Sequence, residues 1–150
     1  GCSNFYERAI AFESAIRKLD LHFSQDSIYT LRSTQSGSFE DMTEILINNK
    51  DNFPSALFAC NDMVAIGAIQ AMQASGIKVP EDVSIIGFDD LPASTVLMPP
   101  LTSMSVPKLE IGKTAVRTLL EKTKLESQYS GTQKILLGGS LIERRSVLKK

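Results

Sequence analysis

The sequence predicts an α/β fold in three layers, with a parallel sheet covered by helices on both faces. A continuous apolar run at 56–60 and a mostly apolar run at 83–88 are typical of strands buried on both sides of a parallel sheet. Segments with amphipathic helical spacing lie before, between and after these runs, and such alternation is typical of right-handed crossovers in a parallel sheet. The 150 residues suit one domain with a substantial core.

The remaining elements follow from local signals along the chain. Apolar spacing predicts four helices, at 6–19, from 39 to the Pro54-Ser55 stop, at 63–74 and at 107–124. Ser38 with Asp41 resembles a capping box, and Pro107 suits a first helical position. Short apolar runs predict three further strands, at 28–31, 135–137 and 141–142. A helix at the very start, with no strand before it, indicates that the sequence begins just after a first strand.

Composition excludes several functions. Lys and Arg total 16 against 17 Asp and Glu, so the formal charge of −1 argues against this chain binding a nucleic-acid backbone. No run of 18 apolar residues is present and no signal peptide is visible, so no membrane partner is expected. Cys2 and Cys60 predict neither a disulfide framework nor a zinc site, and His22 lies at a helix exit, unlike a catalytic histidine. We expect no enzyme activity, metal site or cofactor.

Polar residues follow both buried strands directly. Asn61-Asp62 comes after the first run and Asp89-Asp90 after the second, and the carboxyl ends of parallel strands are where ligands bind in open α/β sheets. Arg8 on the first helix can face the same edge. Carboxylate, amide and guanidinium groups together suit the hydroxyls of a sugar or polyol.

Two other interpretations of these residues remain open. A magnesium site with a phosphate-accepting aspartate would use paired acids, but the order of acids along the chain differs from that of a receiver domain, and no lysine ends a strand. The structural alternative is that Asn61 or Asp62 caps the next helix and that Asp90 caps the next turn. Function is favoured for Asn61 and Asp89, whereas the structural role is at least as good for Asp62 and Asp90.

Three segments, 56–68, 76–90 and 99–103, resemble the LacI/GalR family of bacterial transcription regulators. They read ALFACNDMVAIGA, GIKVPEDVSIIGFDD and PPLTS, and the match in order and spacing extends over 7–145. The resemblance implies a periplasmic-binding-protein-like (type I) subdomain. It also implies that residues 1–104 are the C-terminal effector-binding subdomain lacking its first strand. Residues 105–128 are then a crossing helix that normally packs on an absent N-terminal subdomain, and residues 129–150 form the returning strands and tail.

The resemblance also implies roles for single residues. Arg8 matches the arginine that grips the effector, Asn4 a small polar residue upstream of it, Asn61 the asparagine of the Asn-Asp motif, and Asp89 the first acid of the Phe-Asp-Asp motif. Two family contacts are missing, because Ser33 replaces an aromatic that stacks on the ligand and Val106 replaces a glutamine. A different ligand shape, or a phosphorylated metabolite, would account for these losses. A dimer interface is implied at Met63, Ile66, Met72 and Leu97, with core packing as the alternative for the helix.

The expected function is therefore that of a cytoplasmic repressor fragment that binds a small-molecule effector, a sugar or sugar derivative, and acts as a homodimer. Operator DNA would be contacted only through an absent helix-turn-helix headpiece, and effector binding would control it allosterically. The alternative is a periplasmic sugar-binding protein of a transporter, which shares the fold.

Overall fold

The computed structural model describes residues 3–21, 23–49, 53–124 and 132–148. It contains a four-stranded sheet in the order β1-β2-β3-β4. Strands β1 (Ala56–Phe58), β2 (Ser84–Asp89) and β3 (Thr102–Ser105) are parallel, while β4 (Ser140–Ile142) runs antiparallel to β3. The predicted α/β class is confirmed, with the correction that the sheet is mixed.

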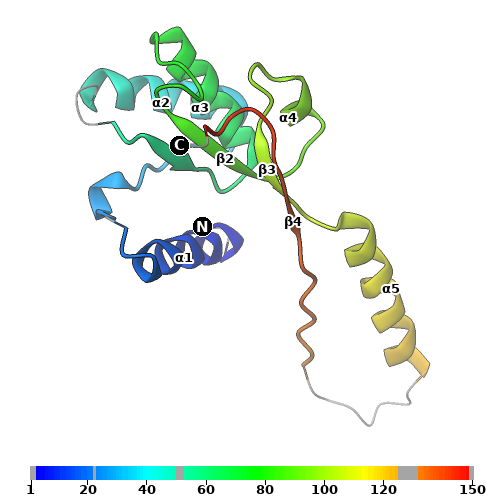
Figure 1. Ribbon diagram of the computed structural model, residues 1–150. Coiled ribbons are helices and arrows are strands. Elements are labelled where there is room, and N and C mark those ends of the chain that lie inside the picture. Colours follow the sequence, from blue (N-terminus) through cyan, green and yellow to red (C-terminus); the bar gives the residue numbers. More distant parts are fainter. Residues whose placement is uncertain (1–2, 22, 50–52, 125–131, 149–150) are drawn as a thin grey trace.

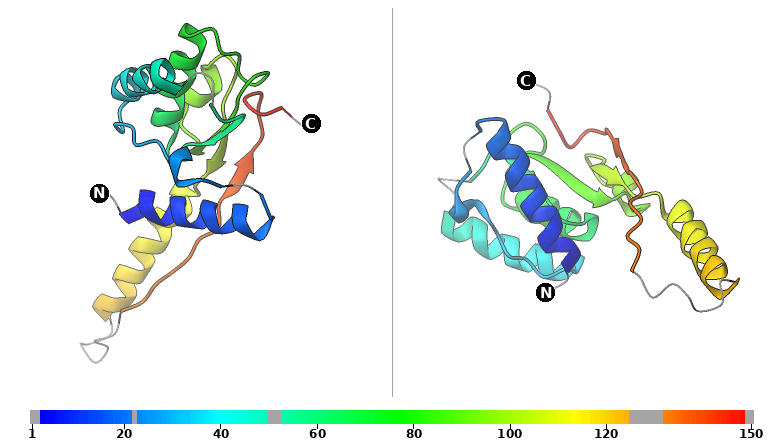
Figure 2. Two further views of the ribbon diagram at one scale, coloured as in Figure 1. Left: turned by 90° about the vertical axis from the view of Figure 1, so that its left-hand side faces the viewer. Right: turned by 90° about the horizontal axis from the view of Figure 1, so that it is seen from below.

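Helices lie on both faces of this sheet (Figures 1 and 2). Helices α2 (Gln35–Asn49) and α3 (Asp62–Ala74) cover one face, and α1 (Ser3–Lys18) crosses the other. Strand alternation explains the division, because Leu57 joins the core beneath α3 while its neighbour Phe58 stacks on Phe12 of α1, with ring centroids 4.8 Å apart. The short elements η1 (Gln25–Ser27) and α4 (Ala93–Val96) complete the body.

Helices α2 and α3 approach each other very closely at Gly67. A Cβ added there would lie 2.3 Å from the Gln35 carbonyl oxygen and 2.8 Å from the Ser38 Cβ. Ser38, fully buried, donates its hydroxyl hydrogen to the Val64 carbonyl across the same contact. The prediction that Ser38 caps a helix is wrong, because α2 begins at Gln35 and Asp41 is bound by Arg32 instead.

Two predicted strands do not form. Residues 28–31 belong to no strand of the described chain, and Tyr29 stacks on Phe53. Residues 135–137 likewise belong to no strand of the described chain, whereas the predicted strand at 141–142 is confirmed as part of β4. Strand β3 was not predicted from the sequence. It pairs with β2 from Ile86↔Thr102 to Asp89↔Ser105.

The C-terminal segment completes the sheet between β2 and β3. Ser146 is fully buried: its carbonyl accepts from the Ile85 amide, its hydroxyl donates to the Ile85 carbonyl, and the same hydroxyl accepts from the Thr102 amide. These bonds satisfy backbone groups of two strands at the point where they diverge.

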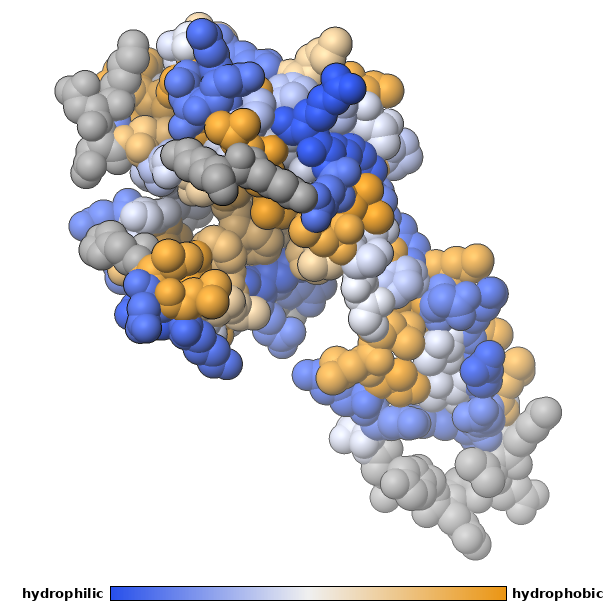
Figure 3. All heavy atoms as spheres, viewed as in Figure 1, coloured by the Kyte–Doolittle hydropathy of each residue, from blue (hydrophilic) through white to orange (hydrophobic). Residues whose placement is uncertain are grey.

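Helix α5 (Lys108–Lys124) projects away from this body, and the returning segment 132–139 runs beside it (Figure 1). Its apolar side chains are open to solvent, as the space-filling view shows (Figure 3): Leu109, Ile111, Val116, Leu119 and Leu120 are 44–70% exposed. The packing of this helix on an N-terminal subdomain stays a prediction. None of the described helices is long and apolar enough to cross a bilayer.

Candidate functional site

The ends of β1 and β2 lie side by side at one edge of the sheet. The parallel register pairs Phe58 with Ile86, so the residues just beyond β1 face Phe88 and Asp89 at the end of β2. The predicted convergence of the two polar strand ends is therefore observed. Strand β3 ends at the same edge, with Ser105 opposite Asp89.

Arg8 of α1 bridges the two strand ends. Its Nη1 donates to the Cys60 carbonyl at 2.7 Å, and its Nη2 lies 3.5 Å from Asp89 Oδ1. The guanidinium carbon sits 3.8 Å from the centroid of the Phe88 ring, a cation–π contact. The arginine is thus fixed in place with its side chain 21% exposed, which leaves part of its donor fork accessible.

Asp89 presents a half-buried carboxylate at this edge. Burial raises the pKa of the Asp89 carboxyl, while Arg8 and Lys108 oppose the rise and Asp62 adds to it. Its φ of 105° lies in a region that side chains rarely adopt, and Asp90 follows with a φ of 50°. The carboxylate is held in a strained turn, and strain of this kind is commonly found at ligand-binding sites.

Asn61 has the structural role that the sequence left open. It is the N-cap of α3: its Oδ1 accepts from the Val64 amide at 2.8 Å, and only 8% of the residue is exposed. It nevertheless lies at the same edge, one residue beyond the carbonyl that Arg8 binds. Asn4 lies one turn before Arg8 on α1 and is exposed.

Asp62 is an internal anchor rather than a helix cap or a ligand. It is fully buried, and its carboxylate accepts from the Leu91 amide, the Ser94 hydroxyl and the Ser103 hydroxyl at 2.5–2.7 Å. These three bonds connect the start of α3 with α4, β3 and the segment that follows Asp89. Among the described residues, no group of three or more histidine, cysteine or acidic side chains could hold a metal ion.

Two cations near Asp90 were missed at the sequence level. Arg144 Nη2 donates to Asp90 Oδ1 at 2.6 Å, and the Lys108 ammonium donates to the Asp89 carbonyl. Asp90 is therefore half of an ion pair and not a turn cap. No local sequence motif indicates either cation. Arg144, for example, lies 54 residues from Asp90 in the chain.

The Asp90–Arg144 pair makes stability depend on pH. The hydrogen bond from Arg144 holds the pKa of the Asp90 carboxyl below its ordinary value, so ionised Asp90 favours the folded state. We expect Asp90→Asn to lower the free energy of unfolding by about 1 kcal/mol or less at pH 7. The loss should fade as pH falls through the folded pKa. Urea unfolding between pH 7 and 3 measures this, and a difference that is constant with pH would contradict it.

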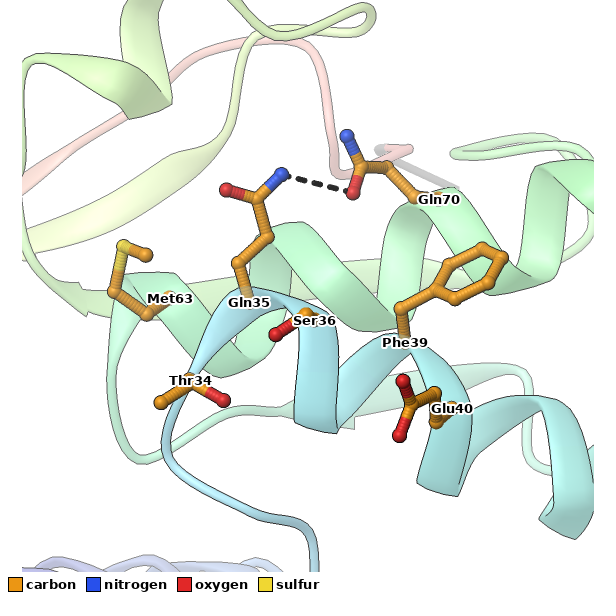
Figure 4. A pocket seen from close by; sticks show the side chains of 7 residues that line it. All are labelled: Thr34, Gln35, Ser36, Phe39, Glu40, Met63 and Gln70. Carbon is orange, nitrogen blue, oxygen red and sulfur yellow. Dashed lines mark hydrogen bonds between the residues drawn. The ribbon is translucent and has the colours of Figure 1, made fainter.

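A hollow of about 630 Å³ opens on the α2/α3 surface (Figure 4), and Arg8 is not among the residues that line it. Gln35 donates to Gln70 across it, and Phe39 and Met63 supply its apolar side chains. Part of the predicted dimer interface is wrong, because Ile66 and Met72 are 3% and 0% exposed and lie inside the protein. Met63 and Leu97 are partly exposed, and their role in a dimer stays a prediction.

Several remaining candidates are placed as follows. Ser33 is exposed in the turn before α2, and Val106 is partly buried between β3 and α5. Cys60 is half-buried, and burial raises the pKa of its thiol, which fits a packed cysteine. Cys2 and His22 lie outside the described residues.

A family model described as a periplasmic binding protein-like domain matches residues 1–147. The chain belongs to the periplasmic binding protein-like domain family. Two curated relatives of this domain come from Haemophilus influenzae. The HTH-type transcriptional repressor PurR (strain PittEE) is 37% identical over 137 residues, which cover 91% of this chain and 40% of PurR. The ribose operon repressor (strain ATCC 51907 / DSM 11121 / KW20 / Rd) is 48% identical over 94 residues, covering 63% and 28% respectively.

Solved structures point to the same regulators. A LacI family transcriptional regulator from Enterococcus faecium with bound ribose superposes with a TM-score of 0.81 at 26% identity, covering 98% of this chain and 54% of that one. The lac repressor dimer bound to operator and the anti-inducer ONPF gives a TM-score of 0.67 at 31% identity, covering 77% and 39%. The resemblance to LacI/GalR regulators is confirmed, and the chain spans about 40% of the length of its first curated relatives.

Proposed function

We propose that this domain forms part of the effector-binding core of a LacI/GalR-type transcriptional repressor, and that its effector is a sugar or a related hydroxylated metabolite. The observation that carries the proposal is the Arg8 bridge, which joins two strand ends beside the Asp89 carboxylate. A fixed guanidinium donates to oxygen atoms and a carboxylate accepts from hydroxyls, so the pair suits the alternating donors and acceptors of a sugar ring.

The other candidate effector-binding residues lie at the same edge of the sheet. Asn61 uses its Oδ1 to cap α3, which leaves its amide nitrogen as the group able to donate to a ligand. Asn4 extends the site along α1. With Ser33 in place of an aromatic, the Phe88 ring beneath Arg8 is an aromatic group that remains at this edge.

DNA binding in this proposal belongs to parts of the repressor that lie outside the chain. The relatives named above are repressors rather than enzymes, which supports a non-enzymatic role in the cytoplasm. The lac repressor neighbour is a dimer bound to operator, which supports a homodimer. Met63 and Leu97 are our candidates for its interface, because both are partly exposed. The same relatives favour the repressor over the alternative, a periplasmic sugar-binding protein of a transporter.

Calorimetric titration of the full-length protein tests the site. Ribose, which is bound in the Enterococcus faecium structure, is the first probe, followed by a panel of pentoses and hexoses. We expect Arg8→Met and Asp89→Asn each to weaken binding about tenfold or more, because each removes a charge-assisted hydrogen bond.

Arg17→Met is the matched control. Arg17 lies on the same helix as Arg8, but its side chain is exposed and pairs with Glu13 of that helix. Its loss should therefore leave the affinity for the sugar unchanged. An affinity equal to that of the parent protein in the Arg8 and Asp89 variants would refute the site, and failure of every sugar in the panel would refute a free pentose or hexose as the effector.

A further inference from the structure

The turn that carries Asp89 is strained and held from several directions. Asp89 and Asp90 have φ values of 105° and 50°, and consecutive non-glycine residues in this region persist only where surrounding contacts enforce them. The Asp90 amide donates to the Ser103 hydroxyl at 3.1 Å, and the Leu91 amide donates to Asp62 at 2.7 Å. These two contacts tie the turn to the body of the domain.

One further contact comes from outside that body. The Lys108 ammonium donates to the Asp89 carbonyl and lies 3.5 Å from the Asp90 carbonyl, so a single side chain engages both strained residues. Two carbonyl oxygens and two nearby carboxylates make this position favourable for a positive charge. An ammonium group, a compact charge with three donors, suits two diverging acceptors.

Lys108 is also the first residue of α5, the helix that projects from the domain. Its side chain therefore spans from the base of that helix back to the edge where Arg8 and Asp89 meet. Pro107 and Val106 form the short covalent connection between β3 and α5. Lys108 adds a second, noncovalent connection that bypasses this linker.

We infer that Lys108 is a positioning residue that couples the orientation of α5 to the conformation of the Asp89–Asp90 turn. When α5 moves relative to the sheet, the ammonium must either leave the two carbonyls or pull the turn with it. Either event changes the contacts that hold the turn carrying the Asp89 carboxylate. The consequence for effector affinity rests on the proposed function, whereas the coupling itself does not.

Amide hydrogen exchange in the ligand-free 150-residue chain tests the coupling. We expect Lys108→Met to accelerate exchange at Asp90 and Leu91 about threefold, the size typical of an exposed charged contact. Lys108→Arg should restore most of the protection. Lys113→Met is the matched control, because Lys113 lies on the same helix and pairs with Glu110, far from the turn.

Residual dipolar couplings of the α5 amides supply the second readout. In the parent chain they should fit one orientation relative to the sheet, and in Lys108→Met they should shrink because the helix samples a wider range. The melting temperature should not change, which separates this effect from general destabilisation. Unchanged exchange at Asp90 and Leu91, or unchanged couplings, in a folded Lys108→Met variant would overturn the inference.

The two proposals can be refuted independently of each other. If turn protection and helix orientation respond to Lys108 but no sugar binds, the coupling stands and the effector assignment falls. If sugars bind through Arg8 and Asp89 but Lys108→Met alters neither readout, the site stands and the coupling falls.

Discussion

The Gly67→Ala substitution should destabilise this domain more than most substitutions that add one methyl group. The added Cβ would meet backbone atoms of α2, at 2.3 Å from the Gln35 carbonyl oxygen and 2.9 Å from the Phe39 nitrogen. Backbone cannot rotate aside as a side chain can, so the two helices must separate. We expect a loss of about 3 kcal/mol in the free energy of unfolding, measured by urea denaturation.

Gly112→Ala is the control for this substitution. Gly112 lies within α5, and nothing surrounds its added Cβ within 4 Å. Alanine in an exposed helix interior is favoured over glycine by up to about 1 kcal/mol, so this variant should be equally stable or more stable. Similar losses in both variants would show that the α2–α3 contact is not the cause.

Asp62→Ala should have an effect of similar size or larger. It would leave the Leu91 amide and the hydroxyls of Ser94 and Ser103 without their common acceptor in a buried position. Leaving several buried hydrogen-bond donors without an acceptor lowers the free energy of unfolding by about 3–5 kcal/mol. Asp62→Asn keeps the shape and one acceptor oxygen, so it should lose less and provides a measurable folded variant.

Asp82→Ala and Asp82→Asn are the matched controls for the Asp62 variants. Asp82 is exposed and accepts from one backbone amide, that of Lys78. Its loss should cost less than about 1 kcal/mol. Asp62 variants that are no less stable than the Asp82 variants would contradict the anchoring role.

The strongest sequence signals predicted the elements that carry the site. The apolar runs that precede Asn61 and Asp89 are confirmed as β1 and β2. The expected burial on both faces is not seen in the described chain: Ala56 is exposed, and buried residues alternate with half-buried ones along β2. Strand β3 escaped prediction because its buried residues are polar. Thr102 and Ser103 are 2% and 0% exposed, and their polarity is satisfied by Ser146, Arg144 and Asp62, all distant in the chain.

The assignment of Ile66 and Met72 to an interface on α3 was wrong for a related reason. A helix that is apolar on most of its surface gives no indication of which side faces the core and which faces a partner. Met72 faces the core, whereas Met63 borders the open hollow. The segment at 28–31 has strand-forming residues, but a strand also requires a pairing partner, which a single sequence does not reveal.

The position of Ser146 constrains when the sheet can form during synthesis. The Ile85 and Thr102 amides find their acceptors on a residue near the end of the described chain, and β4 and Arg144 arrive only slightly earlier. While the polypeptide is still emerging from the ribosome, β2 and β3 can pair with each other, but the Ile85 and Thr102 amides lack these acceptors. The strand pair that carries Asp89 is therefore completed after translation has passed the last helix, and a nascent chain stopped at α5 would present an unfinished sheet to chaperones.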